Sequence, residues 1–206
     1  TFTELQQVVV AKLMEVSCQA FKQSEFCGDP IGYWGGDSMA LLCIVDGLGH
    51  GPEAERAART ILDFVSENID ASPQSLFKGA DEAARSTRGA AVGLVHVDRK
   101  EESFTYVGVG NTRALFFDRR SRAAKLLYST NGIVGAGYKT LRPEQIFFDS
   151  GSLLFLYTDG FPAQIDPGQL SHLQRHPGIV ADEFLDRFTL GTDDAAVLVA
   201  RLESRA

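Results

Sequence analysis

Four aspartate positions in this sequence stand beside a glycine or an apolar run, which is where a chain can gather carboxylates around a cation. They are Gly28-Asp29, Asp46-Gly47, Asp159-Gly160 and Asp193-Asp194. Magnesium and manganese prefer carboxylate and carbonyl oxygens, and an adjacent glycine lets the backbone turn its own carbonyl towards the same ion. The four positions together predict a shared site for hard divalent cations.

A simpler interpretation stays open for each position taken alone, because Asp-Gly is a common turn dipeptide. Jointly, several carboxylates brought close together repel one another and destabilise a fold unless cations neutralise them. Two divalent ions roughly 3.5–4 Å apart can clamp an in-line displacement at phosphorus and activate water, so no protein nucleophile is needed. The sequence lacks the Cys-x5-Arg, Asp-x-Asp, Gly-x-Ser-x-Gly and His-Glu-x-x-His patterns of other hydrolases, which favours this chemistry.

Hydrophobic periodicity indicates the strands that would position these aspartates. Residues 8–21 predict one or two early strands, and the continuous apolar run 39–46 predicts a buried strand that delivers Asp46 to the glycine-rich loop 47–51. Further strands are predicted at residues 91–97, 103–109, 114–117, 124–128, 146–149, 152–158 and 195–202. Short polar turns within 91–128 indicate an antiparallel meander.

Three segments have the apolar spacing of amphipathic helices. The first begins at Pro52 and carries its apolar stripe as far as Ile69. The second is capped by Ser72 and extends to Ala84, and the third covers residues 180–188. Two helices between strands, then a long antiparallel run, then another helix and strand, predict an α+β sandwich rather than a doubly wound sheet.

Length and composition limit the remaining choices. A chain of 206 residues is expected to form a single domain, 1–206, and its net charge of −7 argues against nucleic-acid and anionic-membrane partners. The odd set Cys18, Cys27 and Cys43 contains no Cys-x-x-Cys pair, which is typical of a reducing compartment. The apolar runs are too short to span a bilayer, and the first residues lack a signal-peptide pattern, so we expect a cytoplasmic protein. The oligomeric state is left open.

The aspartates belong to a longer series of motifs in a fixed order. These are Cys27-Gly28-Asp29, residues 44–51 with Ala54 beyond them, Val109-Gly110-Asn111-Thr112-Arg113, Leu156-Tyr157-Thr158-Asp159-Gly160 and Thr192-Asp193-Asp194. The series resembles that of the metal-dependent (type 2C, PPM) protein phosphatases, over nearly the whole chain. Within that superfamily the chain is most similar to the sporulation stage II E branch, and its short length and Asp-Gly-Leu-Gly motif resemble the stressosome phosphatases.

The resemblance implies a four-layer α-β-β-α sandwich, two stacked antiparallel sheets flanked by helices, with two Mn²⁺ or Mg²⁺ ions at one end. By matched positions Asp46 would bridge both ions and Gly47 would give a backbone carbonyl. Asp29 would serve one ion, Asp159 and Asp193 the other, and Asp194 would stand behind these ligands. The implied enzyme is a protein serine/threonine phosphatase. Its expected substrates are phosphorylated STAS-domain proteins of the stressosome or an anti-sigma pathway, so that it would restrain stress signalling.

The chain departs from the family pattern at several positions. Leu48 stands where many type 2C enzymes have a histidine after Asp-Gly, and His50, two residues later, is a candidate general acid or a bystander. Asn111 stands where many relatives have an aspartate for a third cation. The family's phosphate-binding arginine has no match upstream of the first motif, where only Lys22 lies near.

Arg88 and Arg113 are the candidates to contact phosphate in its place, although each can also be an exposed arginine at a strand edge. Two other functions stay open. One is a phosphatase-like binding module without turnover, which the intact aspartates disfavour. The other is a metal-dependent hydrolase of small phosphorylated metabolites, which would differ mainly in its pocket.

Overall fold

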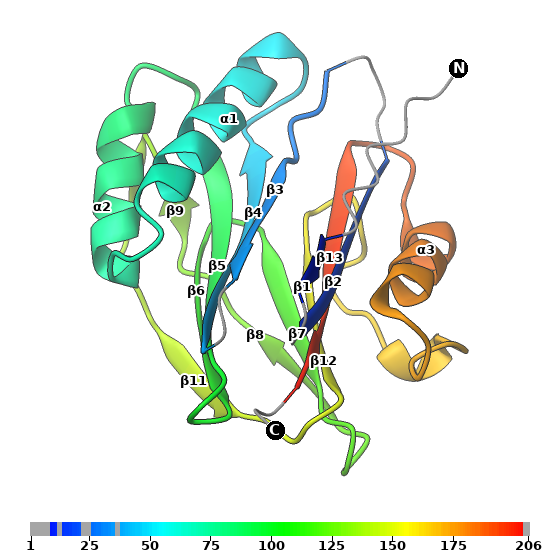
Figure 1. The fold of residues 1–206 in the computed structure, drawn as a ribbon. Helices are drawn as coiled ribbons and strands as arrows, with labels where there is room; N and C mark the ends of the chain where they lie inside the picture. Colours follow the sequence, from blue (N-terminus) through cyan, green and yellow to red (C-terminus); the bar gives the residue numbers. More distant parts are fainter. Residues whose placement is uncertain (1–8, 12–13, 22–25, 36–37, 204–206) are drawn as a thin grey trace.

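Two antiparallel sheets face one another in the middle of the molecule (Figure 1). The computed structural model describes residues 9–11, 14–21, 26–35 and 38–203. Sheet 1 has the order β11 (Glu144–Phe147), β6 (Ser103–Val109), β5 (Ala90–Asp98), β4 (Met39–Gly47) and β3 (Ile31–Gly35). Sheet 2 has the order β1 (Val9–Ala11), β2 (Met14–Phe21), β13 (Ala195–Leu202), β12 (Ser152–Tyr157), β7 (Arg113–Phe117) and β8 (Ala124–Leu127). The start of the predicted first strand, Val8, lies outside the described residues.

Helices cover the outer faces of both sheets (Figure 1). The helices α1 (Pro52–Glu67) and α2 (Pro73–Ala84) pack on sheet 1, and α3 (Pro177–Phe188) packs on sheet 2. A small pair, β9 (Gly132–Ile133) and β10 (Gly137–Tyr138), and a short 3-10 turn, Pro167–Gln169, complete the described elements. The expected four-layer α-β-β-α sandwich is confirmed. Among the described residues no helix is both long and apolar enough to span a membrane.

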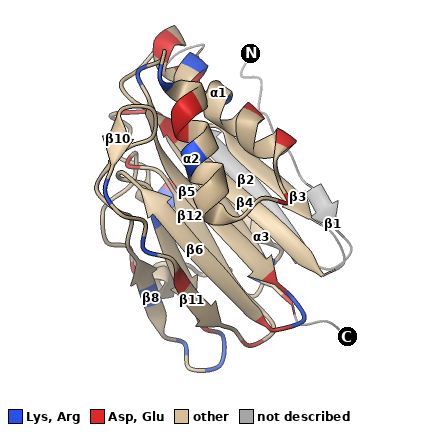
Figure 2. Ribbon diagram, turned by 90° about the vertical axis from the view of Figure 1, so that its left-hand side faces the viewer, with Lys and Arg blue, Asp and Glu red and all other residues tan. Residues whose placement is uncertain are grey.

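The first two helices form where capping and spacing predict them. Pro52 occupies the first turn of α1, whose buried face includes Ala54, Ala58 and Ile61. Its outer face is charged (Figure 2), with Arg56 and Arg59 paired to glutamates one turn earlier. Ser72 caps α2 by accepting a hydrogen bond from the backbone N–H of Ser75.

Ile69 was assigned to the apolar stripe of the first helix, and that assignment is wrong. The helix α1 ends at Glu67, and the N–H of the following Asn68 donates a hydrogen bond to the carbonyl oxygen of Val65. Ile69 therefore lies in the turn beyond the helix and is 39% exposed. Spacing alone could not place this end, because the stripe continues by chance into the turn.

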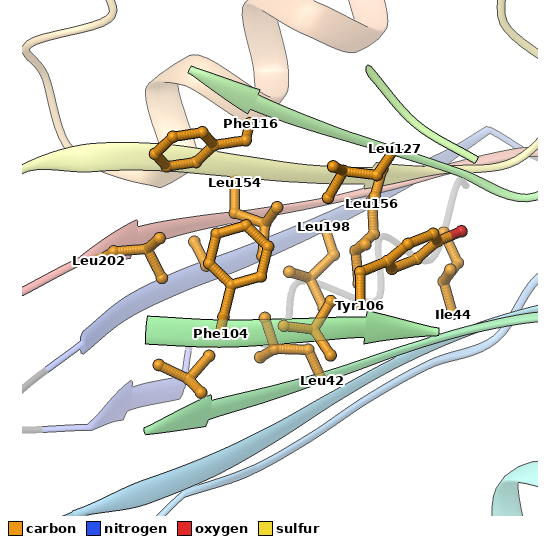
Figure 3. Packing of buried hydrophobic residues seen from close by; sticks show 14 of the residues in the cluster. Leu42, Ile44, Phe104, Tyr106, Phe116, Leu127, Leu154, Leu156, Leu198 and Leu202 are labelled. Atoms are coloured by element: carbon orange, nitrogen blue, oxygen red, sulfur yellow. The ribbon is translucent and has the colours of Figure 1, made fainter. Parts of the chain in front are cut away.

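Strand β4 shows how the sandwich divides its side chains. Leu42 and Ile44 face sheet 2, whereas Leu41 and Cys43 face the helices, because successive side chains of a strand point to opposite faces. Asp46 continues the series that faces sheet 2 and stands where the apolar layer ends. Figure 3 shows that layer, in which Leu42, Ile44, Phe104 and Tyr106 meet Phe116, Leu154, Leu156 and Leu198.

The predicted meander over residues 91–128 is wrong, although its strands exist. The hairpin of β5 and β6 belongs to sheet 1, and that of β7 and β8 belongs to sheet 2. The chain changes sheets at Gly110, which has a φ of 90° and where a Cβ would come within 2.4 Å of the Cβ of Ala91. Likewise, β11 pairs with β6 while β12 pairs with β7, so the turn at Gly151 also joins the two sheets.

The third helix yields a stability prediction. The ring of Phe184 is fully buried and lies 5.1–5.6 Å, centroid to centroid, from Phe155, Tyr157 and Phe161. We expect Phe184→Ala to lower the free energy of unfolding by about 3–5 kcal/mol, because it leaves a cavity between α3 and sheet 2. Urea denaturation measures this, with Ile179→Ala, on the exposed face of the same helix, as the control. Equal effects of the two substitutions would contradict the packing described.

Candidate metal centre

The fold brings the predicted aspartates to one end of the sandwich. Asp46 is the penultimate residue of β4, and Asp29 precedes its antiparallel neighbour β3, in which Ile31 pairs with Ile44. Asp159 follows β12, and Asp193-Asp194 precede β13, in which Val197 pairs with Tyr157. Antiparallel pairing places the end of one strand beside the start of its neighbour, so both residues lie at the same end of their sheet. We call Asp29, Asp46, Asp159 and Asp193 the candidate metal centre.

Two hydrogen bonds of the Gly28 backbone tie the two sheets together at this end. The N–H of Gly28 donates to Oδ2 of Asp194 at 3.0 Å, and the N–H of Gly47 donates to the carbonyl oxygen of Gly28 at 2.9 Å. Asp194 is buried, with 7% of its surface exposed. It holds the backbone next to Asp29, and its place behind the ligands stays a prediction.

The carboxylates differ in burial, and the buried ones resist ionisation. Asp29 is 5% exposed, Asp46 is half-buried, and Asp159 and Asp193 are exposed. Burial raises the pKa of Asp29, a hydrogen bond with the Thr158 side chain lowers it, and the charges of nearby aspartates raise it. Burial also raises the pKa of Asp46, and the charges of Asp29, Asp159 and Asp193 raise it further.

Two carboxylate oxygens of the candidate metal centre lack a partner within the described part of the chain. Oδ2 of Asp29 and Oδ2 of Asp46 are buried and accept no hydrogen bond from those residues. Buried polar atoms normally have a hydrogen-bond partner, so each of these orphaned oxygens indicates a place for a bound ligand. A hard cation fits this donor set, because it would satisfy both oxygens and offset the repulsion between the carboxylates.

Gly47 has a steric reason to be glycine. A Cβ there would lie 2.2 Å from the carbonyl oxygen of Ala54, in the first turn of α1. The helix therefore packs directly on the backbone that the family resemblance assigns as a carbonyl ligand. In the part of the chain that the structure describes, no three His, Cys, Asp or Glu side chains are arranged to hold an ion as they stand. The carboxylates of the candidate metal centre therefore lie at one end of the sandwich without forming a complete coordination sphere.

Three residues that act on the aspartates were not assigned to the site from the sequence. Asn111 donates from Nδ2 to Oδ2 of Asp159 at 2.6 Å, and the Thr158 side chain holds Asp29. Gly28 contributes both its N–H and its carbonyl. All three lie inside the ordered motifs, so motif membership was the available signal.

His50 does not join the aspartates through any recorded contact. It is exposed in the loop after β4, and among the described residues no hydrogen-bond partner is found for it. The loop turns at Gly49 and Gly51, whose φ angles of 88° and 79° suit glycine. The role of His50 as a general acid stays a prediction.

The buried carboxylates yield a prediction for the metal-free protein. Asp46 has a raised pKa in the folded state, so between about pH 4 and that raised value the folded chain binds more protons than the unfolded chain. The free energy of unfolding should therefore fall as pH rises. We expect Asp46→Asn to be more stable than wild type at pH 8, by about 1–3 kcal/mol, and to differ less at pH 5.

Urea denaturation in chelator at both pH values measures this, with Asp186→Asn, an exposed position on α3, as the control. Magnesium should raise the melting temperature of wild type and of the control, but not of Asp46→Asn. A wild type that gains stability between pH 5 and pH 8 without metal would contradict the electrostatics described.

Known proteins resemble this chain in sequence and in structure. The family model of stage II sporulation protein E (SpoIIE) matches residues 36–203. Phosphoserine phosphatase RsbX of Bacillus subtilis (strain 168) is 26% identical over 184 residues, which are 85% of this chain and 87% of RsbX. A crystal structure of RsbX in complex with magnesium has a TM-score of 0.85 at 21% identity and covers 97% of this chain and 100% of its own.

Two further structures have the same fold. One, from a study of the bacterial stressosome as a modular system adapted to control secondary messenger signalling, has a TM-score of 0.83 at 24% identity and covers 91% of this chain and 99% of its own. The other is the catalytic domain of the serine/threonine phosphatase PstP with two manganese ions; its TM-score is 0.64 at 13% identity, over 93% of this chain and 99% of its own. Because the family model spans most of the sequence, the chain belongs to the SpoIIE family of type 2C protein phosphatases.

Proposed function

We propose that this chain is a metal-dependent protein serine/threonine phosphatase that works with two Mn²⁺ or Mg²⁺ ions. The observation that carries the proposal is the pair of orphaned, buried carboxylate oxygens of Asp29 and Asp46 at one end of the sandwich. Support also comes from the relatives, since RsbX is a phosphoserine phosphatase crystallised with magnesium and PstP was crystallised with two manganese ions.

The chain's own residues divide the work of holding the ions. Asp46 would serve both ions and Gly47 would give a backbone carbonyl, with Asp29 on one ion and Asp159 and Asp193 on the other. Two bound ions supply the positive charge that stabilises the transferring phosphoryl group, and they activate water. Asn111 fixes one carboxylate oxygen of Asp159, and Asp194 fixes the backbone of Gly28.

The substrate we propose is a phosphorylated STAS-domain protein of a stressosome or anti-sigma pathway, whose dephosphorylation would restrain stress signalling. The similarity to RsbX and to the stressosome-related structure supports this choice. We further propose that residues 1–206 form a single domain in the cytoplasm. Its buried Cys43, a free thiol whose pKa is raised by burial, is typical of a core cysteine in a reducing compartment.

Phosphate release from a phosphoserine STAS-domain protein tests the proposal. We expect activity with manganese or magnesium, loss of activity in chelator, and recovery when manganese is added back. Asp46→Asn should lower kcat/KM by more than about a hundredfold, because the shared ligand charge acts on the transition state. The control Asp186→Asn should match wild type. Full activity in metal-free buffer, or a normal rate for Asp46→Asn, would exclude the mechanism, and a preference for sugar phosphates would favour the metabolite hydrolase.

The proposed role of His50 has its own test. A general acid protonates the alcohol that leaves from phosphoserine, but p-nitrophenolate leaves without a proton. We expect His50→Ala to slow release from phosphoserine protein by about 10²–10⁴-fold and to leave the rate on p-nitrophenyl phosphate nearly unchanged. Leu48→Ala, a truncation in the same exposed loop, is the control. Equal effects of His50→Ala on both substrates would show that His50 is no general acid.

A further inference from the structure

Arg88 places a positive charge beside the glycine loop that leaves Asp46. A guanidinium nitrogen of Arg88, Nη1, lies 3.0 Å from the position that a Cβ on Gly49 would occupy. Gly49 is three residues after Asp46 in the sequence. Because Gly49 has no side chain, the guanidinium has room to lie against the backbone of this loop. The loop leaves β4 at the end of the sandwich where Asp46 lies.

The backbone around Arg88 is held on both sides, so its place is set by the fold. Thr87 donates two hydrogen bonds to the carbonyl oxygen of Ala84, from its N–H at 2.9 Å and from its hydroxyl at 2.7 Å. The carbonyl of Gly89 accepts from the N–H of Leu48 at 3.0 Å, which joins the turn directly to the glycine loop. Gly89 has a φ of 77°, and a Cβ there would come within 2.5 Å of the carbonyl oxygen of Val134.

The charge of Arg88 is available to a ligand. Its side chain is exposed, and within the described residues it makes no ion pair and donates no hydrogen bond that the structure records. Nearby Arg85, by contrast, forms an ion pair with Asp81, one turn earlier on α2. Its Nη2 lies 4.0 Å from Oδ2 of Asp81. A guanidinium beside the glycine loop that is paired with no carboxylate of the described residues can bind an anion at that place.

The second arginine candidate is used within the fold. Arg113 is half-buried, and its Nη1 donates to the carbonyl of Phe161 at 3.4 Å. Its charge also lies near the buried Tyr157 hydroxyl, whose pKa it lowers against the larger effect of burial. These contacts give Arg113 a structural task and distinguish it from Arg88.

We infer that Arg88 binds the phosphate group of the substrate, an inference that rests on the proposed function. A phosphate monoester carries about −1.5 to −2 charges at pH 7. Two divalent ions would balance the four carboxylates of the candidate metal centre, so a further cation at this end of the sandwich would add to the attraction for a dianion. The guanidinium of Arg88 supplies the missing positive charge and can hold two phosphate oxygens at once. It thereby takes the place of the arginine that the sequence lacks upstream.

Titration of the manganese-loaded protein with inorganic phosphate tests this inference without turnover. We expect Arg88→Ala to weaken phosphate binding about 10- to 100-fold, as for a lost charge-assisted contact. The control Arg85→Ala removes the same charge three residues away and should bind phosphate like wild type. Arg88→Lys should fall between wild type and Arg88→Ala, because lysine keeps the charge but loses the two-pronged geometry.

Kinetics on the phosphoserine protein then separate this inference from the proposed function. With active wild type, Arg88→Ala should lower kcat/KM and raise the inhibition constant of phosphate by a similar factor. Values within about twofold of Arg85→Ala in both measurements would overturn the role of Arg88 and leave the phosphatase intact. A wild type that binds phosphate through Arg88 but hydrolyses no phosphoprotein would overturn the proposed function alone. A wild type that binds no phosphate would overturn the inference.

Discussion

Burial of carboxylates at one end of a β sandwich is the constraint on which the rest of this structure depends. Asp29 and Oδ2 of Asp46 are removed from water, each carboxylate keeps an oxygen with no partner among the described residues, and both resist ionisation. Such an arrangement costs stability, and the protein meets that cost with three apolar layers, one between the sheets and one beneath each set of helices. A divalent cation would remove the repulsion between these carboxylates, because they are the ligands that it prefers.

The two sheets must keep their relative position for these carboxylates to act together. Gly28 is the link, because its carbonyl accepts from Gly47 in sheet 1 and its N–H donates to Asp194 beside sheet 2. The first turn of α1 packs on Gly47 so closely that no side chain fits there. Movement of this helix would therefore act directly on the backbone beside Asp46.

The departures from the family pattern acquire physical meaning in the folded chain. Asn111, which stands where many relatives have an aspartate, uses its amide to fix Asp159, a contact that an ionised carboxylate could not donate. Leu48, in the position of a histidine, is half exposed and brings no polar group to the loop. Arg88, whose guanidinium approaches Gly49 of the glycine loop, is the residue to which we assign the charge of the missing arginine.

The sequence by itself predicted most of the elements and indicated the chemistry, but it missed β3 and the short pair of β9 and β10. Alternating apolar residues marked the strands, Pro52 and Ser72 marked helix starts, and the aspartates with their glycines indicated hard cations. The tertiary structure decided which sheet each strand joins, since a period of two reports burial but not the pairing partner. It also decided which oxygens are orphaned and which arginine stays available. Those properties depend on residues far apart in the chain, such as Gly28 and Asp194, which a local pattern cannot bring together.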